Sequence, residues 1–251
     1  MTWLSNPTAL QERWLWLGGS VVLAILAAGV NWLLHSPPGK LVVWQQRWQR
    51  WPGRPWVQEL VRLVYYLGLP ASALLWRGAL TERGLGLQPF PWSPTIISAA
   101  HTVINWTDWV RDLGWTGGIA LAAALIVFLS QRQVIRLRHT SPARHRDIGV
   151  AFRAAAYQES HWAFYRAPFV LLWGTALGSW AGILPLLVEN ILNPLFWEEL
   201  SSAKRGYNLW LNGILFIAST LIYLQTQNIW CALLADIALR WLWGYKSTAP
   251  E

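Results

Sequence analysis

The chain has 251 residues, of which 54% are hydrophobic and only 13% are charged, and it contains 21 tryptophans. Soluble domains carry about 25% charged residues, so this deficit, together with long uncharged runs, argues against an ordinary soluble domain and predicts a membrane protein. The net charge of +8 comes from basic residues concentrated in two loops, which favours attraction to anionic lipid over nucleic-acid binding. The single Cys231 excludes an internal disulfide and a cysteine-based zinc site.

The first half of the chain contains two predicted spans separated by a basic segment. The apolar run 14–34 is long enough to cross a hydrocarbon layer of about 30 Å. Residues 40–58 alternate apolar and aromatic side chains with Gln and Arg at helical spacing, which predicts an amphipathic helix at the membrane interface. The second span, 57–76, carries Glu59 and Arg62 three residues apart, so we expect them to pair.

The third predicted span, 115–130, is rich in alanine, and small residues favour close helix packing. It follows a mixed segment, 94–112, which we expect to lie at the interface or to enter the membrane partway. The next loop, 131–156, holds six arginines against the single acid Asp147. This loop is the strongest topological signal in the chain.

The fourth span, 167–188, contains Gly174, Gly178 and Gly182, which recur every fourth residue and would share one helix face. Packing against another helix is the simplest use of such a face. A pigment or lipid lying against it is the alternative.

Two final spans, 207–224 and 228–243, bring the total to six and predict an all-α, polytopic transmembrane helical bundle. We expect residues 1–251 to form a single integral membrane domain. The positive-inside rule places the basic loops 40–58 and 131–156 in the cytoplasm, and a bacterial cytoplasmic membrane is the expected location.

One stretch, 157–169, joins the most basic segment to a long apolar run and concentrates ionisable side chains. Glu159 and Arg166 are seven residues apart and share a helix face, and His161 and Tyr165, four apart, also share one. Ionisable groups entering a membrane are costly and need partners. This stretch is therefore the first candidate for a functional site.

A family resemblance appears near the C-terminus. The segment 221–240, LIYLQTQNIWCALLADIALR, resembles the last motif region of the CPBP family, the CAAX-protease and bacteriocin-processing (Abi) type of intramembrane protease. That family often ends in a run like YLRTGNLW followed by HALxN. The connector 83–89, RGLGLQP, is similar to the family's LGLRP connector. The resemblance implies a catalytic set made of a Glu-Glu-x-x-x-Arg helix, a Phe-x-x-x-His helix and a final His-x-x-x-Asn.

The sequence departs from that catalytic set. Asp236 and Arg240 stand where the final His and Asn would fall, and residues four apart suit a buried ion pair better than water activation. Glu198-Glu199 is followed by Arg205, two residues later than in the family pattern, and no Phe-x-x-x-His occurs. The resemblance therefore implies a scaffold that has lost its catalytic residues.

The departures lead to two functional hypotheses. The first is a non-catalytic, CPBP-like membrane protein that binds a protein partner as a structural or assembly subunit of a larger complex, such as a photosynthetic or respiratory one. The alternative is an intramembrane endopeptidase with a rearranged site. Its candidate residues would be Glu159, His161, Arg166, Glu198, Glu199 and Asp236.

No cofactor and no metal site is predicted, because a metal needs three or four converging ligands and the five histidines are scattered. His101 and His161 are the only histidines placed near membrane depth, and they are the weak candidates for cofactor binding as pigment ligands. A hydrogen-bonded interfacial role is the simpler interpretation of both. A bound lipid or pigment stays open, as does transport.

Overall fold

The computed structural model describes residues 8–35, 39, 42–76, 78, 80, 82–90, 106–138, 147–201 and 206–243. These residues are helical apart from short turns, and no strand occurs among them. The prediction of an all-α protein is confirmed for this part of the chain.

Three helical segments within the described ranges are long and apolar enough to cross a membrane: Leu10–Leu33, Trp106–Gln133 and Leu209–Thr226. A further pair, Ile148–Ala181 and Ile183–Ile191, passes the same test together but bends by 49° at its break. The chain therefore has three candidate spans, or four if the bent pair counts as one. This supports a membrane protein with transmembrane helices.

Two of the six predicted spans are not among these candidates. Residues 57–76 are helical, in three consecutive pieces: α3 (Arg54–Leu63), the π-helix η3 (Val64–Gly68) and α4 (Leu69–Leu75). The last predicted span is α11 (Ile229–Trp243), a helix of 15 residues, shorter than the 20 or so that a straight crossing needs. Six spans and a bundle therefore stay predictions. The pair predicted in 57–76 is present, with Arg62 Nη1 4.0 Å from Glu59 Oε2.

Contacts along the chain divide it into two compact units. The first comprises Met1–Thr81 and Ser160–Leu209, and the second comprises Glu82–Glu159 and Trp210–Glu251. The long helix α7 (Ile148–Ala181) begins in the second unit and ends in the first. The prediction of a single integral membrane domain is not tested by this division, which reflects contacts alone.

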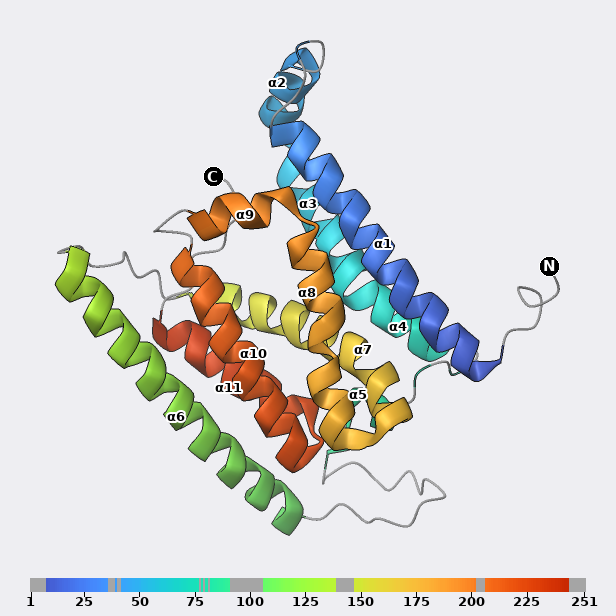
Figure 1. Ribbon diagram of the computed structural model, residues 1–251, viewed down its shortest axis with the longest axis vertical. Helices are drawn as coiled ribbons and strands as arrows, with labels where there is room; N and C mark the ends of the chain where they lie inside the picture. The colour runs from blue at the N-terminus through green and yellow to red at the C-terminus, as the bar shows by residue number, and fades with distance from the viewer. Residues whose placement is uncertain are drawn as a thin grey trace. The chain divides into compact units, whose positions relative to one another are not determined.

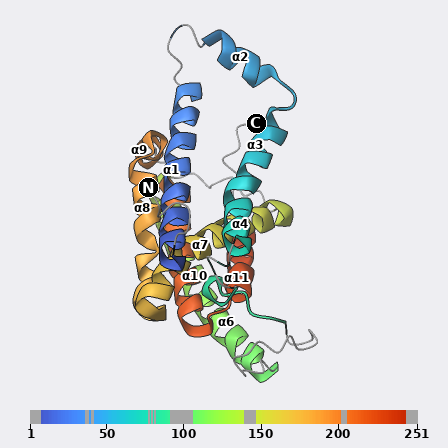
Figure 2. The same cartoon turned by 90° about the vertical axis from the view of Figure 1, so that its right-hand side faces the viewer.

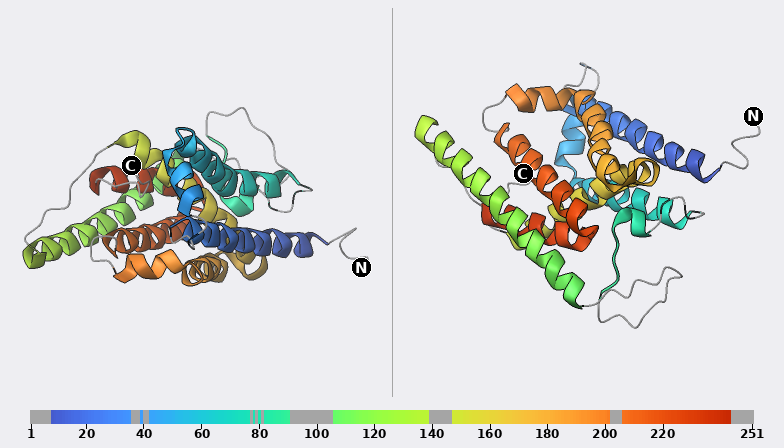
Figure 3. Two further views of the ribbon diagram at one scale, coloured as in Figure 1. Left: turned by 90° about the horizontal axis from the view of Figure 1, so that it is seen from above. Right: turned by 60° about the horizontal axis from the view of Figure 1, so that its bottom comes forward.

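In the first unit, α1 (Ala9–His35) lies between α3–α4 on one side and α8 (Ile183–Ile191) and α9 (Pro194–Ser201) on the other (Figures 2 and 3). From Leu17 onward its buried residues recur three or four positions apart, as one helix face requires. They are Leu17, Ser20, Ala24 and Ala28, and Glu12 is buried nearer the start of the helix. The small side chains on this face allow neighbouring helices to approach closely.

The helix α7 is interrupted at Gly174, where φ is +77°, a conformation that residues other than glycine rarely adopt. Beyond this point the chain folds back on itself. A Cβ on Gly178 would collide with the backbone of Phe169, and a Cβ on Gly182 would lie 2.9 Å from the Cα of Arg166. The prediction that all three glycines share one helix face is therefore wrong, because Gly174 makes the turn while the other two line the contact between its arms.

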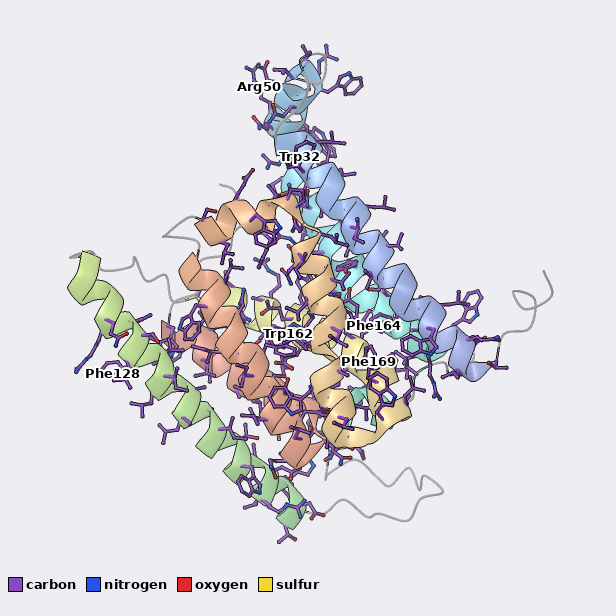
Figure 4. The ribbon with its side chains drawn as sticks, viewed as in Figure 1. Trp32, Arg50, Phe128, Trp162, Phe164 and Phe169 are labelled. Atoms are coloured by element: carbon purple, nitrogen blue, oxygen red, sulfur yellow. The ribbon has the colours of Figure 1, made fainter. Side chains whose placement is uncertain are left out.

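In the second unit, α6 (Trp106–Arg138) packs against α11, and α10 (Gly206–Thr226) joins α11 through a tight turn (Figure 1). The ring of Phe128 on α6, labelled in Figure 4, lies 6.3 Å from that of Trp243. α6 begins at Trp106, so the end of the mixed segment 94–112 belongs to this long helix. The remainder of that segment lies outside the described residues.

The two segments that carry the CPBP resemblance lie against each other in this unit. Gly86, with φ +78°, ends the short helix α5 (Glu82–Leu85), and its carbonyl accepts a hydrogen bond from Ile229 N at 2.9 Å. The side-chain amide of Gln88 donates to Thr226 O at 2.8 Å, and Trp230 Nε1 donates to Gln88 O at 3.0 Å. The connector is thus attached to the turn between α10 and α11.

Candidate functional site

The second unit contains a small pocket where three helices bring polar side chains together. α7 supplies Glu159, α10 supplies Ser219 and α11 supplies Asp236. Apolar side chains complete the lining: Leu215, Ala218, Ile222, Ala232, Ala235 and Leu239. The pocket is too narrow to hold a water molecule.

Glu159 is almost completely buried, with 1% of its surface exposed. Ser219 Oγ donates a hydrogen bond of 2.7 Å to Glu159 Oε2. A buried carboxylate is strongly unfavourable unless hydrogen bonds or opposite charge satisfy it. Ser219 therefore partly compensates the burial of Glu159.

Asp236 and Arg240 form the predicted buried ion pair. Arg240 Nε lies 2.8 Å from Asp236 Oδ1, and the two side chains are 0% and 2% exposed. Arg240 also donates to the side-chain oxygens of Gln158 and, at 3.3 Å, Asn212. The guanidinium thus links α7, α10 and α11, and the prediction of a buried ion pair four residues apart is confirmed.

The rearranged catalytic set is only partly gathered at this pocket. Glu159 and Asp236 line it, whereas His161 and Arg166, both 3% exposed, belong to the first unit. Glu198 is exposed on α9, also in the first unit. The side chain of Glu199 and the whole of His101 lie outside the described residues. The endopeptidase hypothesis stays a prediction.

The polar partners of these charged groups were not predicted from the sequence. Ser219 and Asn212 are uncharged residues within the apolar helix α10, and Gln158 directly precedes Glu159. A polar side chain within an apolar run needs a hydrogen-bonding partner, so the positions of Ser219 and Asn212 indicate that each has one. The sequence did not say which charged group each of them would meet.

A second polar cluster lies in the first unit, around Glu189 on α8. His161 Nε2 is 3.0 Å from Glu189 Oε2, and Tyr165 OH donates to the same oxygen at 2.9 Å. Tyr65 OH donates to Glu189 Oε1 at 3.2 Å, and Ser20 Oγ donates to Tyr165 OH at 3.4 Å. Three donors thus converge on one carboxylate. The cluster joins α1, η3, α7 and α8.

The π-helix η3 shapes this cluster. The rings of Tyr65 and Tyr66 lie 4.9 Å and 5.0 Å from the ring of His161. Adjacent residues of a regular α-helix point about 100° apart, whereas a π-turn adds a residue and changes the register of the side chains. Within this wider turn, both Tyr65 and Tyr66 lie beside the imidazole of His161.

Neither cluster resembles a metal centre. Among the described residues, no group of three or more His, Cys, Asp or Glu side chains is placed to hold a metal ion. The two clusters differ in chemistry, because an arginine lies beside the acid in the second unit while an imidazole and two phenols surround the acid in the first.

Comparisons with protein-family models, curated proteins and solved structures found no match. The CPBP resemblance therefore rests on the motifs quoted above and stays a prediction.

Proposed function

We propose that the protein is a non-catalytic, CPBP-like integral membrane protein that serves as a structural or assembly subunit of a larger membrane complex. The observation that carries this proposal concerns Glu159 and Asp236, the two acids of the rearranged catalytic set that line the pocket. Asp236 is paired with Arg240, Glu159 accepts a hydrogen bond from Ser219, and the pocket between them has no room for water.

The requirements of peptide hydrolysis support a non-catalytic role for this pocket. A water-activating protease needs a base within reach of a water molecule and donors for the developing oxyanion. No histidine lines this pocket, and Arg240 neutralises Asp236. The charged groups serve to hold α7, α10 and α11 together.

A surface on α6 favours a lateral protein partner. Gly114, Gly118 and Ala122 are exposed at successive four-residue spacings, and a Cβ built on either glycine meets nothing within 4 Å. Leu121 and Leu125 beside them are 73% and 56% exposed. Faces of this kind allow another transmembrane helix to approach closely.

Photo-crosslinking from α6 tests this partnership in the native membrane. We expect a photoreactive residue at Leu121 to join one membrane protein reproducibly, and Gly118→Leu to reduce that product several-fold because the added side chain blocks close approach. Gly29→Leu on α1 is the matched control, since a Cβ there also meets nothing, and it should leave the product unchanged.

A native purification gives the second result. The protein should run with that partner in gentle detergent, and mass spectrometry of the same fraction would identify any bound lipid or pigment. A lone monomer, with no crosslinked protein at Leu121, would contradict the proposal.

We also propose the membrane arrangement. Six spans form one bundle, with the basic segments 40–58 and 131–156 on the cytoplasmic side of a bacterial cytoplasmic membrane. The helix α2 (Val42–Arg50) supports an interfacial position for the first segment, because Trp44 is 68% exposed and Arg47 and Arg50 lie in its last turn. Arg50 is seen at the tip of α2 in Figure 4.

A further inference from the structure

The cluster around Glu189 has no part in the proposed subunit role. Its members come from four helical elements of the first unit: Ser20 from α1, Tyr65 from η3, His161 and Tyr165 from α7, and Glu189 from α8. We propose that this cluster is a proton-binding site within the membrane domain, where His161 and Glu189 together take up and release one proton.

The pair has two protonation states, and neither satisfies every group. With His161 neutral, Nε2–H donates to Glu189, and no cation within the cluster balances the negative carboxylate. With His161 protonated the charges balance, but Nδ1 then carries a hydrogen. Nδ1 is buried and has no hydrogen-bond partner among the described residues. Each protonation state therefore carries a cost that the other state relieves.

The exposure of the two side chains indicates where the proton enters. The Glu189 side chain is 21% exposed, whereas that of His161 is 4% exposed. The carboxylate is therefore the member of the pair that an arriving proton meets first, while Nε2 keeps the hydrogen that it donates across 3.0 Å. Hydrogen bonds from Tyr165 to Glu189 and from Ser20 to Tyr165 extend the same network toward α1.

The side chains that face His161 and Glu189 are phenols and an alcohol, so the pair itself is where a proton is gained or lost. Tyr65 and Tyr66 face it from η3, Tyr165 from α7 and Ser20 from α1. Phenols and alcohols keep their protons near neutral pH. The π-turn supports a functional role, because such turns occur frequently at functional sites.

A titration of His161 by NMR tests the proposal on the full chain in lipid nanodiscs. Replacing the other four histidines with Gln leaves His161 as the only histidine, so ¹⁵N-histidine labelling reports on it alone while the site stays intact. We expect Nδ1 to gain a proton as the pH falls from mildly alkaline to mildly acid. An imidazole that keeps one protonation state over this range would overturn the proposal.

The role of the carboxylate is tested by Glu189→Gln in the same background. Gln keeps the size of the side chain but removes the negative charge that favours the imidazolium, so the proton affinity of His161 should fall about tenfold or more. Glu198→Gln is the matched control, because Glu198 is an exposed acid on α9 of the same unit, and it should leave the affinity unchanged. Equal proton affinities in the two variants would overturn the pairing.

Discussion

At the scale of single residues, the membrane setting makes every buried charge depend on a specific neighbour. Arg240 is completely buried and serves Asp236, Gln158 and Asn212 at once. Glu189 accepts from an imidazole and from phenols instead of from a guanidinium. The partners of the two acids differ in their proton chemistry. Arginine keeps its proton permanently, whereas imidazole can lose it near neutral pH.

The buried ion pair leads to a stability prediction. Arg240→Met leaves Asp236 without its cation, and breaking a buried pair in this way costs about 3–5 kcal/mol. Replacing both partners, as Asp236→Leu with Arg240→Met, removes both desolvation penalties and should recover most of that loss. Thermal unfolding in one detergent measures the difference. A double variant no more stable than Arg240→Met would contradict a pair that acts as a unit.

At the scale of elements, α7 folds back on itself at Gly174. The regular glycine spacing predicts one helix face, but in the structure the glycines form a turn and the contact between its two arms. Gly174 adopts the positive φ that turns the chain, and Gly178 and Gly182 then lie against residues before the turn. The fold-back precedes α8, which carries Glu189. The close approach of these two arms is therefore part of how the polar cluster is assembled.

Matched alanine substitutions test this approach. Gly178→Ala places a Cβ against the backbone of Phe169, so we expect a loss of about 1–3 kcal/mol, as for other overpacked sites. Gly29→Ala, in a helix with open space around it, should be neutral or stabilising by up to about 1 kcal/mol because alanine is the better helix former. Both melting temperatures are measured under the same conditions. Equal shifts of the same sign would contradict the close contact.

At the scale of the whole molecule, the topology depends on whether residues 57–76 cross the membrane. If they do, the segments that follow α1 and α6 lie on the same side; if they do not, one crossing fewer places them on opposite sides. The pairing of Glu59 with Arg62 near the start of this segment lowers the cost of its charges. We expect a crossing, in agreement with the positive charge of both segments.

Cysteine labelling from each side of the membrane measures this topology. The natural Cys231 is completely buried and is replaced by Ala to give a background without cysteine. Gln46→Cys and Ile148→Cys then report on the two basic segments, and both positions are exposed. Both should react with an impermeant maleimide from the cytoplasmic side. Labelling from opposite sides would contradict a crossing by 57–76 and, with it, the six-span arrangement.

The sequence by itself determined the helical class, the presence of helices long and apolar enough to cross a membrane, and the pairing of Asp236 with Arg240, because these depend on composition and on spacing along one helix. The tertiary structure decided the partners that come from different helices. Ser219 beside Glu159, and Glu189 beside His161, are 60 and 28 residues apart in the chain, and helical periodicity carries no information over such distances. The turn at Gly174 likewise depended on tertiary packing, since a regular glycine spacing suits a helix face as well as it suits a close fold-back.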